Sequence, residues 1–282
     1  MGAGRAGTAV AVLLQRAGHE IVAVSGREPT RERAARFLPG VAVVDPAAAP
    51  AGSDLVIIGL PDDLIEPIVS SIATDVGFGE GQWVAHLSGA SPLSVLDGAR
   101  AAGARRLAIH PLQTFPDPDA GIARIPGSTI AVGADDEQGF DIAEGIAADL
   151  GGRPFRLPDD RRGLYHAAAV FASNDLVAVA AVAERLFGSA GVPDPVAAMH
   201  PLQEATVANI ASMGTGAALT GPAVRGDAGT IERNLAALSS TEPWAVPAYV
   251  ELTRVALDVA VRSGRLGPAA RDRVEEVLRR WT

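Results

Sequence analysis

Short apolar runs alternate with stretches of helical periodicity along the first half of the chain. Apolar runs bounded by Gly, Pro or polar residues predict buried strands, and apolar residues recurring every three to four positions predict amphipathic helices. Their alternation predicts a doubly wound parallel sheet of the α/β class. The predicted strands are 19–25, 41–44, 54–59, 83–87, 106–109, 128–132 and 154–157, and the predicted helices between them include 8–17, 64–72 and 136–150.

The pattern changes after about residue 158, where long helical stretches follow with almost no strand signal. The first of them, 161–190, is apolar on nearly every face, which predicts burial between other helices or in a subunit interface. Further helices are predicted at 195–213, 230–239, 246–263 and 268–281. We therefore predict two domains, an α/β domain over residues 1–158 and an all-helical domain over residues 159–282.

The chain begins within a GxGxxG fingerprint, followed by a helix and then a strand. In a dinucleotide-binding βαβ unit these glycines allow a sharp turn and a close approach of the backbone to a pyrophosphate at the helix N-terminus. The apolar strand that normally precedes the turn is missing, so we expect a Rossmann sheet whose first strand is truncated, through start-site choice. The turn residues predicted to bind the cofactor are Gly2, Ala3, Gly4, Arg5, Ala6 and Gly7.

Polar residues gather where the predicted strands end, and ligands of such sheets bind at the carboxyl ends of the strands. We expect these residues to face one cleft: Ser25, Arg27, Pro61, Asp62, His86, Ser88, His110 and Gln113. Further cofactor contacts are predicted from Gly26, Leu60, Pro61, Ser88 and Gly89.

The end of the second predicted strand indicates which dinucleotide binds. NAD sites usually place an acidic residue there to accept hydrogen bonds from the ribose. Here the strand ends in Ser25, Gly26 and Arg27, which offer a hydroxyl and a guanidinium where a 2′-phosphate would lie. The sequence therefore favours NADP(H), although Glu28 follows directly.

Composition excludes several kinds of chemistry. The chain has no cysteine, which removes disulfides, thiolate nucleophiles and thiolate metal sites, and we expect no metal. All 24 basic residues are arginine, so Schiff-base chemistry is excluded too. The net charge of −9 argues against nucleic acid as a partner. No apolar run reaches the roughly 18 to 20 residues needed to cross a bilayer, so we expect a cytoplasmic protein without membrane partners.

Three segments combine polar and apolar residues in patterns that the chain's composition does not explain. They are 110–115, 165–174 and 218–227, and the last contains Thr-Gly-Pro and Arg-Gly-Asp. With the glycine fingerprint and the strand end at 87–90, they resemble the two-domain family "Rossmann-like plus domain of unknown function 2520". That family is similar to oxidoreductases with a helical domain like the C-terminal domain of 6-phosphogluconate dehydrogenase, including ketopantoate reductase, 3-hydroxyisobutyrate dehydrogenase and pyrroline-5-carboxylate reductase. The resemblance implies NADP-dependent hydride transfer to a small carbonyl or imine between the domains, in a homodimer formed through the helical domains.

The chain departs from this group at the proton donor. The hydroxyacid members use a lysine and an asparagine on the first long helix of the second domain. Asn174 can stand for the asparagine, but Val170 lies one turn earlier and no lysine exists to replace the missing one. Another group must therefore deliver the proton when a ketone is reduced.

A histidine suits this role because it titrates near neutrality. His166 is the first candidate, since on a helix it can share one side of a cleft with Ser173 and Asn174. His110 is the alternative, because it lies at a strand end where the nicotinamide is expected. Either histidine could instead be structural, and His86 is expected to be a strand residue that bonds a backbone carbonyl.

The loop that contains Thr220, Arg225 and Asp227 is a candidate substrate contact. Arg225 could bind an anionic substrate group or pair with Asp227. We thus predict an NADP-dependent reductase of a small carboxylate-bearing ketone or imine. The alternatives are a non-catalytic NADP(H) sensor and a remnant whose truncated strand no longer supports binding.

Overall fold

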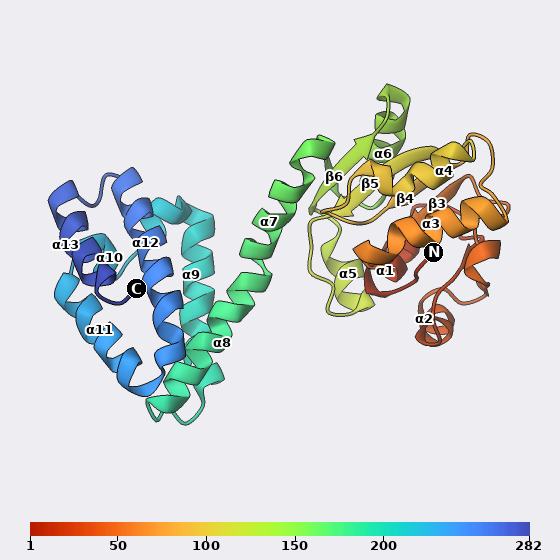
Figure 1. Ribbon diagram of the computed structural model, residues 1–282. Coiled ribbons are helices and arrows are strands. Elements are labelled where there is room, and N and C mark those ends of the chain that lie inside the picture. Colours follow the sequence, from red (N-terminus) through yellow and green to blue (C-terminus); the bar gives the residue numbers. More distant parts are fainter. The chain divides into compact units, whose positions relative to one another are not determined.

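The computed structural model describes residues 1–282, and the chain separates into two compact units, Met1–Asn174 and Asp175–Thr282 (Figure 1). The predicted domain boundary after residue 158 remains a prediction. The first unit contains α1 (Arg5–Arg16), β1 (Ala23–Val24), α2 (Pro29–Phe37), β2 (Ala42–Val43), η1 (Pro46–Ala48), β3 (Leu55–Ile58), α3 (Asp62–Asp75), β4 (Trp83–His86), η2 (Leu93–Leu96), α4 (Asp97–Ala101), β5 (Arg105–Pro111), α5 (Pro118–Arg124), β6 (Thr129–Ala134), α6 (Glu137–Asp149), β7 (Arg153–Arg156), η3 (Asp159–Arg161) and α7 (Arg162–Ala172).

The strands of the first unit form a two-stranded sheet, β1-β2, and a five-stranded sheet in the order β3-β4-β5-β6-β7. All pairs are parallel except β5 and β6, which are antiparallel, with His110 opposite Ala131. The sheet predicted as parallel thus contains one antiparallel pair. The predicted α/β class is confirmed.

Backbone hydrogen bonds connect the first residues of the chain to both sheets. The Met1 ammonium donates to the Ile57 carbonyl, Gly59 N donates to Met1 O over 2.9 Å, and Ala3 N donates to Ser25 O over 3.0 Å. Residues 1–3 thus lie between the ends of β1 and β3 and bond to both. Alongside the strands themselves, a narrow slot separates β1 from β3. The two strands therefore do not pair, and the two sheets are distinct.

Helices cover both faces of the five-stranded sheet, as the alternation of apolar runs predicts (Figure 1). Residues of α1, α5 and α6 pack with Leu107 and Ile109 of β5 on one face. Residues of α3, η2 and α4 pack with Val56, Ile58 and Val84 on the other. Since successive side chains of a strand point to opposite faces, this split follows from the sequence of each strand.

The second unit is helical, and its core is formed by residues of α10, α11, α12 and α13. Ile231, Leu235, Val250, Leu257 and Val274 are fully buried in it. Its elements are α8 (Asn174–Ser189, starting one residue earlier), α9 (Pro195–Ala218), α10 (Pro222–Arg225), α11 (Ala228–Thr241), η4 (Pro243–Ala245), α12 (Val246–Arg262) and α13 (Pro268–Arg279).

The predicted helix 161–190 forms as α7 and α8, with a break in helical geometry at Ser173. By length and composition alone, the helical stretch Asp159–Ser189 is apolar enough to span a membrane, with a hydropathy of 1.5 in its most apolar window, none of which is buried. This corrects the expectation that no such run exists. The predicted burial against other helices of the chain is wrong, because α8 contains no buried residue.

Candidate functional site

The glycine turn has the close backbone packing that its fingerprint predicts. Gly2 has φ of +68°, and a Cβ there would lie 2.8 Å from the Gly59 carbonyl oxygen. A Cβ on Gly7 would lie 2.7 Å from the carbonyl oxygen of Gly2. Side chains at either position would push the turn away from the end of β3, so glycine is required for this geometry.

A cavity of about 650 Å³ opens beside this turn, and we call it the glycine-turn cavity. No side chain caps the N-terminus of α1, so its first amides are available to an anion. The residues that line the glycine-turn cavity include no Asp or Glu. They are Met1, Gly2, Ala3, Gly4, Ser25, Gly26, Arg27, Pro29, Thr30, Arg33, Pro46, Gly59, Leu60, Pro61, Leu64 and Ile68.

Three polar side chains give the glycine-turn cavity its chemistry. Arg27 is exposed, and Arg33 donates from Nε to the Ala3 carbonyl over 2.9 Å, which leaves its two terminal nitrogens for other partners. The Ser25 hydroxyl is buried and has no hydrogen-bond partner. Glu28 lies at the start of α2 and does not line the cavity. This end of the cavity is therefore positive, and a buried hydroxyl without a hydrogen-bond partner lies in its wall.

A second cavity of about 690 Å³ lies along α7, and we call it the α7 cavity. It brings together the four predicted catalytic residues, His110, His166, Ser173 and Asn174. Its other lining residues are Leu112, Gln113, Thr114, Phe115, Tyr165, Ala168, Ala169, Val170 and Ala172. All of them belong to the first compact unit.

The predicted single cleft is thus two cavities. Ser25, Arg27 and Pro61 line the first, and His110 and Gln113 line the second. The residues between them are packed: Ser88 is 6% exposed, and its hydroxyl accepts from the amides of Ala90 and Ser91, so it shapes the turn after β4. A Cβ on Gly89 would lie 2.8 Å from the His110 ring, so the ends of β4 and β5 touch there.

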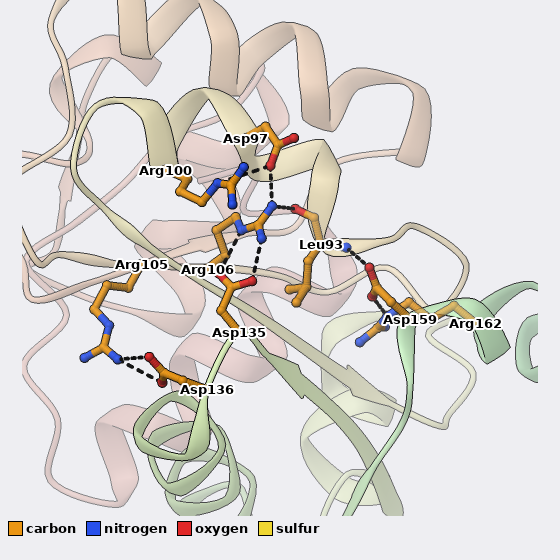
Figure 2. A network of polar contacts seen from close by, with 9 residues as sticks. All are labelled: Leu93, Asp97, Arg100, Arg105, Arg106, Asp135, Asp136, Asp159 and Arg162. Carbon is orange, nitrogen blue, oxygen red and sulfur yellow. Dashed lines mark hydrogen bonds and ion pairs between the residues drawn. The ribbon is translucent and has the colours of Figure 1, made fainter.

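Asp159 connects the start of α7 to η2 (Figure 2). Its carboxylate accepts from Leu93 N and from Arg162 Nε, each over 2.8 Å. Nearby, the buried Arg106 pairs with Asp97 and Asp135 and ties β5 to both neighbouring turns (Figure 2). Asp159 thus holds the start of α7 in place, and Arg106 holds the turns beside β5.

Arg162 is buried inside the sheet unit, at 1% exposure. Neither of its terminal nitrogens has a hydrogen-bond partner, and Nη2 lies against Gly133, where a Cβ would be 2.4 Å away. Burial lowers the pKa of Arg162, and Asp159 opposes that shift. The guanidinium is therefore a fixed positive charge beside Gly133 of β6.

This charge and burial hold two histidines neutral. Burial lowers the pKa of His110 to about 4, with the charges of His166 and Arg162 adding to the effect. Burial and Arg162 lower the pKa of His86 to about 3. His86 was expected to bond a backbone carbonyl. The structure corrects this: Ser88 favours its protonated ring weakly, but neither ring nitrogen has a hydrogen bond of ordinary geometry.

In the second unit, Asp227 caps α11 by accepting from the Thr230 amide over 3.0 Å and from the Thr230 hydroxyl over 2.7 Å. These bonds lower the pKa of Asp227. Arg225 is exposed and forms no ion pair with Asp227 within 4.0 Å, so the proposed pairing of the two side chains is wrong. The role of Thr220, Arg225 and Asp227 in substrate binding remains a prediction.

Three residues of the site were missed by sequence reasoning. Arg33 lies six residues after Arg27, on the helix that follows it, a spacing that could have been noticed. Tyr165 directly precedes His166 in a segment already singled out, yet only the histidine was considered. Arg162 gave no signal, because an arginine at a helix start usually points to solvent.

Two family models match the chain. Residues 1–111 match the Rossmann-like domain, and residues 128–256 match the domain of unknown function DUF2520. The resemblance predicted from the motifs is confirmed. The match continues beyond the sheet unit into α12 of the helical unit.

Solved structures with the same fold include a protein from Bacteroides fragilis assigned as an NADP oxidoreductase, at 26% identity and a TM-score of 0.76, covering 91% of this chain and 96% of that one. A protein from Thermotoga maritima has 23% identity and a TM-score of 0.69, with 92% and 97% covered. A reductive aminase from Aspergillus terreus in complex with NADPH and ethyl levulinate has 23% identity and a TM-score of 0.64, with 98% and 96% covered. No curated protein matches the chain. The predicted α/β Rossmann domain followed by a helical domain is confirmed.

Proposed function

We propose that this protein is an NADP(H)-dependent oxidoreductase that reduces a small carboxylate-bearing ketone or imine. One observation carries the proposal: the cavity beside the glycine turn is lined by Arg27 and Arg33 and by no carboxylate. A 2′-phosphate needs cations there, whereas the ribose of NAD is usually held by an acidic side chain. The similar protein from Bacteroides fragilis is assigned to the same class.

The residues present fit the dinucleotide. The close-packed glycines leave room for a pyrophosphate at the start of α1, and the unused Ser25 hydroxyl with Arg27 and Arg33 can bind the 2′-phosphate. Leu60 and Pro61 offer an apolar wall. Gly89 follows β4 and lies against His110 of β5, because neighbouring strands of a sheet are about 5 Å apart. The cofactor, when bound, supplies a hydride.

The α7 cavity is our candidate for the substrate site. The Asn174 amide and the Ser173 hydroxyl can bind a substrate carboxylate or carbonyl, and His110 and His166 contact the same cavity. Apolar residues of α7 form the rest of the wall, which suits a small carbon skeleton. Thr220, Arg225 and Asp227 of the helical unit are proposed as further substrate contacts.

The proposal is tested by following NADPH oxidation with 2-ketopantoate, pyrroline-5-carboxylate and short 2-keto acids. We expect turnover with at least one carboxylate-bearing ketone or imine, and a preference for NADPH over NADH. Absence of turnover by protein that binds NADPH in a fluorescence titration would contradict the proposal.

A non-catalytic NADP(H) sensor is the second candidate, favoured by the absence of the lysine used in related hydroxyacid enzymes. A sensor should bind NADPH without turning over any substrate. Variants of His166, His110 and Asn174 would then keep their NADPH affinity and have no activity to lose.

We also propose a homodimer formed through the helical unit in the cytoplasm. Apolar side chains on α8 and α9 are exposed in the single chain: Leu176, Val177, Val179, Val196, Leu202, Val207, Ile210 and Met213. Exposed apolar side chains in this number on two helices are typical of an interface. A second copy of the same face can cover it.

A further inference from the structure

A tyrosine and a histidine in the wall of the α7 cavity contact each other through a hydrogen bond and through their rings. The Tyr165 hydroxyl lies 2.9 Å from His110 Nδ1, and the two rings meet edge to face with centroids 5.5 Å apart. Phe155 contacts the Tyr165 ring, at a centroid distance of 5.8 Å. Both residues of the pair line the cavity, and Asp159 anchors the helix that carries Tyr165.

We propose that Tyr165 is the catalytic acid of this cavity, and that His110 positions it and hydrogen-bonds the phenolate left after proton transfer. This inference rests on the proposed function and names the donor that the missing lysine leaves open. Neither histidine then has to act as the acid.

The charges around the pair support this division of roles. Because the pKa of His110 is lowered to about 4, the ring is neutral and carries one N–H at neutral pH. With that proton on Nδ1, His110 donates to the phenol oxygen and leaves the Tyr165 proton free for a ligand. Burial raises the pKa of Tyr165 to about 12, so the hydroxyl stays protonated, while the charge of Arg162 favours its anion.

The step balances as a two-electron reduction. A hydride from NADPH forms a C–H bond at the carbonyl or imine carbon, and the π electrons move to the oxygen or nitrogen. That atom takes the Tyr165 proton, the phenolic O–H bond breaks, and the product is an alcohol or amine with NADP⁺. An alkoxide is a stronger base than a phenolate, so the transfer is downhill. Water reprotonates Tyr165 after product release.

The test compares Tyr165→Phe with Tyr249→Phe, which changes the only other tyrosine in the chain. Tyr165→Phe keeps the ring packing and should lower kcat by about 100-fold or more, the usual size of a general-acid effect. The NADPH dissociation constant should stay within about twofold of the wild type, because the glycine-turn cavity is untouched. Tyr249→Phe should leave kcat unchanged.

The pH profile separates tyrosine from histidine. A general acid must be protonated, so its rate falls as the pH rises through its pKa. With Tyr165 as the donor, kcat should be flat between about pH 6 and pH 9. A fall near the usual histidine pKa, together with full activity in Tyr165→Phe and loss of activity in His166→Asn, would overturn the proposal and leave the oxidoreductase function intact.

A second measurement does not need turnover. Tyrosinate absorbance titrations of the wild type and Tyr165→Phe give the ionisation midpoint of Tyr165 by difference. His110→Phe keeps a ring but removes the hydrogen bond, so this midpoint should rise. An unchanged midpoint would overturn the role of His110. Absence of turnover in wild-type protein that binds NADPH would overturn the proposed function and this donor together.

Discussion

Arginine side chains decide the chemistry of the glycine-turn cavity. Arg33 is held by the Ala3 carbonyl, while Arg27 is exposed at the same opening. Because the chain has no lysine, every cation that a phosphate could contact is a planar guanidinium, which binds phosphate oxygens in pairs. The choice between two dinucleotides is therefore a property of individual residues.

Replacing Arg27 with leucine should weaken NADPH binding by about tenfold or more, since a charge-assisted contact contributes about 1.5–3 kcal/mol. NADH binding should change little, because it lacks the 2′-phosphate. Fluorescence titrations with both nucleotides check this. Arg31→Leu is the matched control, because Arg31 is an exposed arginine of α2, four residues after Arg27, and does not line the cavity. Equal losses for both nucleotides would contradict the prediction.

His86 should make the folded protein sensitive to acid. The unfolded chain binds a proton at this histidine below about pH 6.5, whereas the folded chain binds it only near pH 3. Between these values the unfolded state holds more protons, so the free energy of unfolding falls as the pH is lowered. The groups that face His86 electrostatically are Arg162 and His110.

His86→Leu should flatten this dependence by about 2–3 kcal/mol between pH 6.5 and pH 4. Urea unfolding at several pH values measures it. His200→Asn, an exposed histidine, should leave the slope unchanged. If His86→Leu and the wild type lose stability in parallel on acidification, His86 is not the group responsible.

At the scale of elements, the slot between β1 and β3 leaves strand edges unpaired. Residues 20–24 lie on one side of it and residues 55–57 on the other, with Ala11 and Leu14 of α1 also lining it. The Met1 ammonium is buried at its end, and burial lowers the pKa of this amine to about 6. Burying this amine and leaving two strand edges open both cost stability.

Appending four apolar, β-branched residues before Met1 should fill the slot and join the two sheets. The free energy of unfolding should rise by about 3 kcal/mol, from new ladder hydrogen bonds and apolar burial. Thermal and urea unfolding measure the change. An appended Gly-Ser segment of equal length is the control, and equal stability of the two extensions would show that the slot does not accept a strand.

At the scale of the whole molecule, the exposed apolar face of α8 and α9 should determine the oligomeric state. Stable interfaces bury about 1,200–2,000 Å² in total, which two facing helices from each copy can supply. Introducing Leu202→Glu with Val207→Glu should place charges in that interface and dissociate the dimer.

Analytical ultracentrifugation should show the double variant at the chain mass of 28.8 kDa and the wild type at twice that mass. Val76→Glu, which changes an exposed apolar residue at the end of α3, should remain dimeric. A wild type that sediments as a monomer would exclude the proposed dimer.

Much of the fold was predictable because its signals are local. Every strand of the five-stranded sheet coincides with a predicted apolar run, and the long helices follow their periodicity. The direction of β6 was not predictable, since it depends on how the chain returns after α5 rather than on the residues of the strand. The site was predicted in part: His110, His166, Ser173 and Asn174 line one cavity, but Tyr165 became a candidate only through its contact with His110.

The sequence by itself determined the glycine turn, Arg27 just after β1 and the absence of lysine and cysteine, because these are facts of residue identity and spacing. The tertiary structure decided which polar groups meet. Arg162 and Asp159 are close in sequence, and this spacing alone predicts their contact. Only the tertiary structure brings the positive charge of Arg162 close enough to lower the pKa of His110 and of His86. Burial, which no single residue encodes, then sets which of these groups carries a proton.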